Sequence, residues 1–138
     1  MTNYDDIDFS ALDALAEGEV VTHSLVRDIR LPSGKVLALI TLDNGRDHTR
    51  PNTFGPTTLV ELGETLDALA ARAASGEIQA VGVTGKQYIL AAGADLSDIS
   101  RVPSKEVARW VAQLGHQVLG TLSTLGVPSF AFVNGLAL

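Results

Sequence analysis

Four very small residues (Ala-Ala-Gly-Ala) stand together at positions 91–94, immediately before Asp95 and Leu96. Small side chains let another molecule approach the main chain closely. We expect this segment to end a strand, with Asp95 as the N-cap of a short helix over residues 96–99. Because a helix start presents unpaired N–H groups and a positive dipole end, the segment suits a backbone donor that stabilises an oxygen gaining negative charge. A close-packed turn before a capped helix is the alternative interpretation.

The three histidines do not have the spacing of a metal site, because no two of them stand four residues apart on one helix. His116 falls about 180° from the apolar face of its expected helix and should be solvent exposed. His23 is expected in the middle of a strand without a partner nearby. His48 shares a polar loop with Arg46 and Arg50, where contact with an anionic ligand is one interpretation and a plain solvated loop is the simpler one.

The sequence Gly-Val-Thr-Gly-Lys at positions 82–86 has only a partial likeness to a phosphate-binding loop. A P-loop needs a glycine where this chain has Ala80, and a serine or threonine where it has Gln87. We therefore exclude a P-loop. Three acidic residues near the N-terminus are expected to form a solvated terminus rather than a metal site: Asp5, Asp6 and Asp8.

The strands that must position the small-residue segment follow from hydrophobic periodicity. Residues 20–42 predict a β-hairpin with a turn at 31–35, and the apolar run at 36–40 predicts burial on both faces of the second strand. A polar loop is expected over residues 43–55. Three further short strands are predicted at residues 78–84, 88–92 and 129–133.

Two long helices are predicted between these strands. One begins at Pro56 and ends at Gly76; its apolar face consists of Leu59, Leu62, Leu66, Leu69 and Ala73. The other begins after Ser104; its apolar face consists of Val107, Val111, Leu114, Val118, Leu122 and Leu125. Glu61 and Glu64 lie beside the first apolar face and are expected to be ordinary polar-face charges. A short capped helix is also expected after Asp8.

The order strand, strand, helix, strand, strand, helix, strand predicts an α/β fold. Each helix that returns to a strand implies a crossover connection, and therefore a partly parallel sheet. The length of 138 residues corresponds to about one domain. No internal repeat, low-complexity tract or linker divides the sequence.

Composition excludes several classes of protein. With 46% apolar and 19% charged residues the chain can bury a core, so it is not a disordered protein. A net charge of −6 argues against binding to nucleic acid or to a membrane surface. There is no cysteine, and we find neither a secretory signal nor an apolar run of roughly 18 residues. A cytoplasmic location is expected.

Three blocks of the chain resemble the enoyl-CoA hydratase/isomerase (crotonase) family. Residues 79–96 contain a strand ending in Thr-Gly, a short insertion and then Ala-Gly-Ala-Asp-Leu, in the order of the family motif. Residues 40–54, with Arg-Pro-Asn-Thr-Phe, and residues 127–138, with Val-Asn-Gly-Leu-Ala-Leu, are similar to two further family blocks. The blocks follow the family's order over residues 36–138 and leave the preceding part of the chain uncovered.

The resemblance implies a crotonase-like (ClpP/crotonase) fold, a spiral of ββα repeats that is truncated here. Residues 20–138 are then the N-terminal half of a domain, and residues 1–19 are an N-terminal extension. The extension and the long loop at residues 48–50 are similar to the hydratase-like part of proteins fused to a 3-hydroxyacyl-CoA dehydrogenase. Because the family usually assembles as trimers or hexamers, a homo-oligomer is expected.

The resemblance also implies roles for single residues. In the family, the backbone N–H of the residue before the motif's Asp is half of an oxyanion hole for the thioester carbonyl, and here that residue is Ala94. The residues implied to line the substrate path are Ala92, Gly93, Ala94, Asp95, Leu96 and Asn52. Two positions depart from the family pattern, since Ser97 replaces a basic residue and Leu90 replaces an aromatic one.

The activity implied by the resemblance is hydration or isomerisation of a 2-enoyl-CoA through an enolate. Isomerases, dehalogenases and thioester hydrolases of the family share the same donor and are not separated by these residues. A second donor and the acid/base carboxylates are expected after Leu138, and no candidate base is expected near Ala94, so the chain alone should lack hydratase activity. A non-catalytic crotonase-like module for acyl-CoA binding or assembly is the alternative. No metal is expected, and no cofactor beyond the coenzyme A of the substrate.

Overall fold

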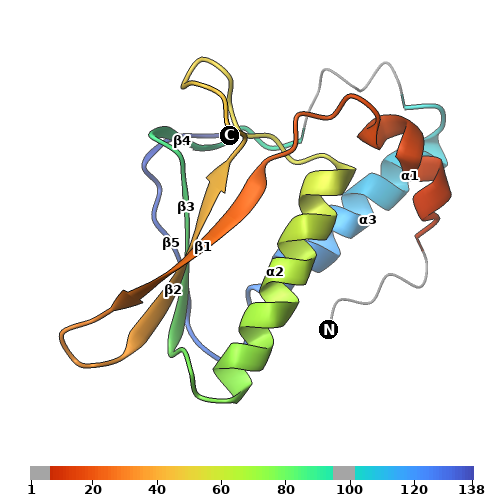
Figure 1. Cartoon of the computed structure of the whole chain (residues 1–138). Helices are drawn as coiled ribbons and strands as arrows, with labels where there is room; N and C mark the ends of the chain where they lie inside the picture. Colours follow the sequence, from red (N-terminus) through yellow and green to blue (C-terminus); the bar gives the residue numbers. More distant parts are fainter. Residues whose placement is uncertain (1–6, 95–101) are drawn as a thin grey trace.

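The computed structural model describes residues 7–94 and 102–138 (Figure 1). In chain order these residues form α1 (Phe9–Ala16), β1 (His23–Arg30), β2 (Val36–Asp43), α2 (Pro56–Ala74), β3 (Ala80–Gly85), β4 (Tyr88–Ala91), α3 (Lys105–Thr121), β5 (Ser129–Ala131) and β6 (Gly135–Ala137). The predicted strands and long helices are confirmed, and β6 is an additional strand. The short helix expected over residues 96–99 lies outside the described residues.

The strands form two sheets. The larger sheet has the order β1-β2-β3-β5, in which β1 and β2 are an antiparallel hairpin and the other neighbours are parallel. The smaller sheet pairs β4 with β6 in parallel at one end of the larger sheet (Figure 1). A helix lies in the chain between the members of each parallel pair, as parallel pairing requires. The predicted hairpin and partly parallel sheet are therefore confirmed.

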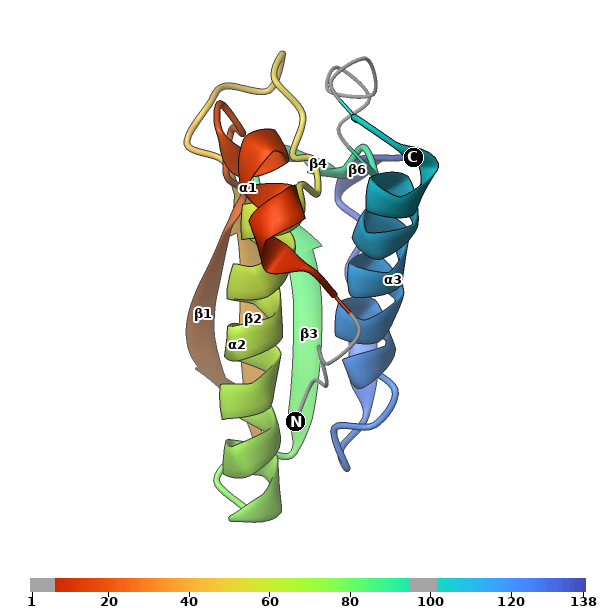
Figure 2. The ribbon, with the colours of Figure 1, turned by 90° about the vertical axis from the view of Figure 1, so that its right-hand side faces the viewer.

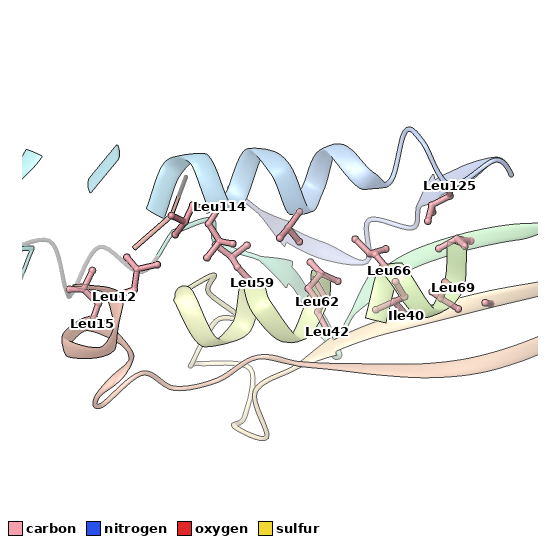
Figure 3. Close-up of a cluster of buried hydrophobic side chains, with 14 of the residues drawn as sticks. Leu12, Leu15, Ile40, Leu42, Leu59, Leu62, Leu66, Leu69, Leu114 and Leu125 are labelled. Atoms are coloured by element: carbon pink, nitrogen blue, oxygen red, sulfur yellow. The ribbon is translucent and has the colours of Figure 1, made fainter. Parts of the chain in front are cut away.

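Both long helices pack on one face of the larger sheet, and α2 and α3 lie side by side (Figure 2). The side chains buried between the helices and the sheet include Leu59, Leu62, Leu66, Leu69, Val107, Leu114, Val118, Ala38, Ile40 and Leu42 (Figure 3). Burial of each leucine contributes roughly 1.5–3 kcal/mol. The predicted apolar faces are thus the core faces. Leu125 is also buried, although α3 ends at Thr121.

α1 packs against the two long helices and adds Leu12 and Leu15 to the core (Figure 3). Asp8 caps α1, because its Oδ1 accepts hydrogen bonds from the Ser10 hydroxyl at 2.6 Å and the Ser10 N–H at 3.0 Å. These hydrogen bonds, led by the one from the hydroxyl, lower the pKa of Asp8. Asp8 is therefore a helix cap, whereas Asp5 and Asp6 lie outside the described residues.

Candidate functional site

The small-residue segment follows β4 and runs beside the loop that precedes α2. The Ala92 N–H donates to the Asn52 carbonyl at 2.8 Å, and the Phe54 N–H donates to the Gly93 carbonyl at 2.9 Å. Phe54 and Ala94 also form an isolated parallel bridge. Main-chain hydrogen bonds therefore fix the position of the segment, and its side chains do not need to do so.

The other side of the segment contacts the end of the smaller sheet. The Leu138 N–H donates to the Ala91 carbonyl at 3.1 Å. Gly93 has a φ of +72°, and a Cβ at this position would lie 3.2 Å from the Leu138 carbonyl oxygen. Glycine is thus favoured both by the left-handed backbone conformation and by the close approach of a second chain segment.

Asn52 supports the segment from the protein interior. Its side chain is 0% exposed, and its Nδ2 donates to the carbonyls of Leu42 at 2.8 Å and Leu90 at 3.0 Å. Its Oδ1 accepts from the Asn44 N–H at 3.1 Å. These contacts join the end of β2 to β4, which gives Asn52 a positioning role. The direct substrate contact implied for Asn52 stays a prediction.

Ala94 lies on the wall of a mostly apolar pocket with a volume of about 540 Å³. The pocket is lined by the start of α2, by one face of α3 and by residues 93–94. Phe54 and Leu59 are among the lining residues. Ala94 is exposed, and no acceptor within the described part of the chain binds its N–H. The N–H is therefore available to a ligand in the pocket.

His116 is the one titratable side chain among the described residues that line this pocket. Its predicted exposure is confirmed. The expectation that no candidate base lies near Ala94 stays a prediction, and His116 is the candidate that lines the same pocket as Ala94. The available signal in the sequence is the helical spacing of Ala108, Ala112 and Gly115, since small residues on one helix face leave space beside it.

Lys86, the lysine of the rejected P-loop likeness, has a structural role. Its Nζ donates to Asn44 Oδ1 and to the carbonyls of Arg46 at 2.9 Å, Asp47 at 3.1 Å and Arg50 at 2.6 Å. The side chain is nearly buried. The ammonium group thus holds the loop over residues 44–50 in place by hydrogen bonds to oxygen atoms of that loop.

The other two histidines lie outside the lining of the Ala94 pocket. His23 Nδ1 is 3.0 Å from Glu61 Oε2, and Glu61 also accepts from the Ser24 N–H at 2.9 Å. The expectation that His23 has no partner is therefore wrong. Glu61 is also not simply a solvated charge on the polar face of α2, because it joins this helix to the start of β1. The His48 ring packs edge-on against Tyr88, with the ring centroids 6.0 Å apart.

Asp95 and Leu96, two of the predicted site residues, lie outside the described residues, as does Ser97. Within residues 7–94 and 102–138, no group of three histidine, aspartate or glutamate side chains is arranged to hold a metal ion. In the same ranges, no helix has both the length and the apolar character needed to cross a membrane.

Comparison with known proteins gives curated relatives, two of which are described here, although no family model matches the chain. The chain is 32% identical over 111 residues to the fatty acid oxidation complex subunit alpha of Shewanella loihica, which covers 79% of this chain and 15% of that protein. It is 30% identical over 92 residues to 4-chlorobenzoyl coenzyme A dehalogenase-2 of an Arthrobacter species, which covers 64% of this chain and 33% of that protein.

The solved structure of an enoyl-CoA hydratase from Bacillus anthracis matches with a TM-score of 0.65 and 22% identity. The match covers 81% of this chain and 40% of that chain, and it shows that the fold is crotonase-like. Together with the two relatives, it places the chain in the enoyl-CoA hydratase/isomerase (crotonase) family. The chain spans well under half the length of these family members.

Proposed function

We propose that this chain forms the acyl-CoA-binding part of an enoyl-CoA hydratase or isomerase. The carbonyl oxygen of the thioester accepts a hydrogen bond from the Ala94 N–H, and the acyl group occupies the apolar pocket. The observation that carries the proposal is a main-chain donor, without an acceptor in the described chain, on the wall of that pocket. The name of one relative, a 4-chlorobenzoyl coenzyme A dehalogenase, supports a coenzyme A thioester as the ligand.

The chemistry of such a site depends on the position of the donor. Hydration and isomerisation of an enoyl thioester pass through an enolate, whose oxygen gains negative charge. The hydrogen bonds of Ala92 and Gly93 fix the backbone before the reaction, so stabilisation at Ala94 needs no reorganisation. Loss of one such donor typically costs roughly 2.7–4 kcal/mol of transition-state stabilisation.

We expect that the chain alone binds the thioester but does not add water to crotonyl-CoA. Water addition needs a proton donor and a proton acceptor, and no described side chain in the lining of the pocket is a carboxylate. The check is the absorbance of the enoyl group during incubation with purified chain. Turnover of crotonyl-CoA that Ala94→Pro abolishes would overturn this expectation.

A non-catalytic crotonase-like module for acyl-CoA binding is the second candidate. The absence of a carboxylate side chain from the described lining favours it. Both candidates bind acyl-CoA at Ala94, and they differ in turnover. The protein that carries this chain converts crotonyl-CoA under the first candidate and binds it unchanged under the second.

Binding is tested by titration of ¹⁵N-labelled chain with butyryl-CoA and, separately, with coenzyme A. We expect the amide resonance of Ala94 to shift with butyryl-CoA only, and the midpoint of thermal unfolding to rise. Ala94→Pro removes the N–H and should weaken binding about 2- to 10-fold, whereas Ala94→Gly keeps the N–H and should not. An Ala94 resonance that stays in place while butyryl-CoA saturates the chain would contradict the proposal.

The proposal includes no metal and no cofactor beyond the coenzyme A of the substrate. Nucleic acid and membrane surfaces are not among the proposed partners, because the net charge of −6 opposes contact with phosphate groups. A homo-oligomer and a cytoplasmic location are also part of the proposal.

A further inference from the structure

Helix α3 has two adjacent faces with different roles. One face is buried in the core and includes Val107, Leu114 and Val118. The other lines the Ala94 pocket and consists of Ala108, Val111, Ala112, Gly115, His116 and Leu119. Three of these six residues (Ala108, Ala112 and Gly115) are very small, so the helix leaves space for the pocket beside it. His116 therefore occupies a face that borders a cavity, and not an ordinary solvated surface.

His116 differs from the other histidines in having its imidazole free of described partners. His23 contacts Glu61, and the His48 ring contacts Tyr88. For His116, no side chain or carbonyl within the described residues forms a hydrogen bond or an ion pair. The remaining described side chains of the pocket lining are apolar. An imidazole in this position is available to a ligand and to solvent protons.

We propose that His116 is a catalytic residue that removes a proton from the carbon next to the thioester carbonyl. This inference rests on the proposed function, because it places the carbonyl at Ala94. The C–H bond breaks, the proton binds the imidazole, and the electron pair moves onto the carbonyl oxygen, which the Ala94 N–H stabilises. Return of a proton from the imidazolium to carbon re-forms the C–H bond, so the step needs no oxidant, reductant or co-reactant.

Three features of the pocket favour this step. Histidine is the side chain that most often acts as a general base in enzymes. The apolar lining strengthens the interaction of the enolate with its donor. His116 is also exposed, so its bound proton exchanges with solvent. In D₂O the carbon next to the carbonyl therefore acquires deuterium, even though this partial reaction involves neither a carboxylate nor water addition.

The experiment measures deuterium incorporation into butyryl-CoA, which has no double bond to hydrate. The full 138-residue chain is incubated with butyryl-CoA in D₂O, and the product is analysed by mass spectrometry and NMR. We expect incorporation above the protein-free rate. His116→Gln should reduce the protein-dependent rate about 100-fold or more, with binding of butyryl-CoA kept within a few-fold of wild type.

His48→Gln is the matched control, because His48 is also an exposed histidine and does not line the pocket. This variant should keep the wild-type rate. A second readout is the imidazole resonance of His116, assigned by its loss in His116→Gln, which should shift when butyryl-CoA binds.

The outcomes separate the two proposals. If butyryl-CoA binds at Ala94 but wild type and His116→Gln incorporate deuterium equally, or not at all, the catalytic role of His116 is overturned and the proposed function stands. If butyryl-CoA does not bind, or leaves the Ala94 amide unshifted, the proposed function fails and the role of His116 fails with it.

Discussion

Two buried polar side chains hold the loop beside the pocket without lining the pocket themselves. The Asn52 amide joins the end of β2 to β4, and the Lys86 ammonium group joins the end of β3 to residues 44–50. Each side chain donates to several main-chain carbonyls that are buried or partly buried. Its removal therefore leaves acceptors without a donor, and that desolvation cost exceeds the modest net value of a formed hydrogen bond.

Replacement of Asn52 tests this account at the centre of the site. Asn52→Ala should lower the free energy of unfolding by about 2–4 kcal/mol, because the Leu90 carbonyl loses the Asn52 donor, the Leu42 carbonyl keeps only the Lys86 N–H, and the Asn44 N–H loses its acceptor. Urea unfolding monitored by circular dichroism measures the change. Gln87→Ala, at an exposed position, should change stability by less than about 0.5 kcal/mol. Equal effects of the two variants would contradict the positioning role.

Lys86→Met is the corresponding test for the loop. The variant keeps the apolar stem but leaves the carbonyls of Arg46 and Arg50 without this donor, so we expect a loss of about 1–3 kcal/mol. Hydrogen exchange should also become faster at residues 44–50. Lys35→Met makes the same change at an exposed position and serves as the control. Similar exchange rates in both variants would show that Lys86 does not hold the loop.

The roles of these single residues were only partly predictable from the sequence. Periodicity gave the exposure of His116, but its place beside a pocket depends on where residues 54–59 and 93–94 lie. The same is true of Lys86, because its acceptors are about 40 residues earlier in the chain. The partners of His23 and Asn52 are likewise distant in sequence. Local pattern carries no information on such contacts.

At the scale of elements, helix α2 begins with an N-terminus that is capped from outside the helix. Gly55, the N-cap residue, supplies no side-chain hydrogen bond. Instead Glu19 accepts hydrogen bonds from the N–H groups of Thr57 at 2.8 Å and Thr58 at 2.9 Å, and from the Thr58 hydroxyl at 2.7 Å. A carboxylate at this end also interacts favourably with the helix dipole. The connection from α1 to β1 thus stabilises the helix that forms one wall of the pocket.

Glu19→Ala should therefore lower the free energy of unfolding by about 1–2 kcal/mol. Chemical denaturation measures the loss, and hydrogen exchange should show faster opening of the first turn of α2. Glu64→Ala removes an exposed carboxylate from the middle of the same helix and should have little effect. If Glu64→Ala destabilises the chain as much as Glu19→Ala, the loss reflects net charge and not capping.

Most elements were predictable because their periodicity is local, and the exceptions have tertiary causes. The predicted first strand begins at residue 20, yet β1 begins at His23. Thr22 is buried and hydrogen-bonds with Thr58 and with the Thr53 carbonyl instead of continuing the β1–β2 ladder. β6 was not predicted because it is a three-residue strand that depends on pairing with β4.

At the scale of the whole molecule, a group of exposed large apolar side chains lies near the end of the chain. They lie on and around β5 and β6 and include Phe130 at 51% exposure, Phe132, Val133, Leu136 and Leu138. Solvent-exposed apolar patches of this kind favour association. The expected homo-oligomer would cover this region, which we call the β5–β6 surface.

Self-association of the chain is the corresponding prediction. Sedimentation velocity should show a mean molecular mass that rises with protein concentration, because contact removes the β5–β6 surface from water. Phe130→Asp should weaken this association. Leu25→Asp is the matched control, since Leu25 has a similar exposure of 54% on the opposite edge of the sheet. A chain that stays monomeric at all concentrations would contradict the prediction.

The overall fold was predictable because both the order of strands and helices and the order of the three motif blocks depend on the whole chain. Strand and helix order gave the α/β class and the parallel pairing, and the family resemblance gave the crotonase-like fold. The pocket was not predictable in this way. The pocket forms only where α2, α3 and residues 93–94 come together in the folded chain. The sequence of any one of these segments does not indicate that they do so.

The strand order has a consequence for the kinetics of folding. The β1–β2 hairpin pairs segments that are neighbours in sequence. In the parallel part of the sheet, Leu37 pairs with Ala80 and Val81 pairs with Ser129, which are distant in sequence. Pairings between distant residues form slowly, because loop-closure entropy is lost before the contacts are gained. The backbone around Ala94 is held by residue 54 on one side and by residue 138 on the other. The wall of the Ala94 pocket formed by residues 93–94 should therefore be among the last parts of the molecule to assemble and among the first to open.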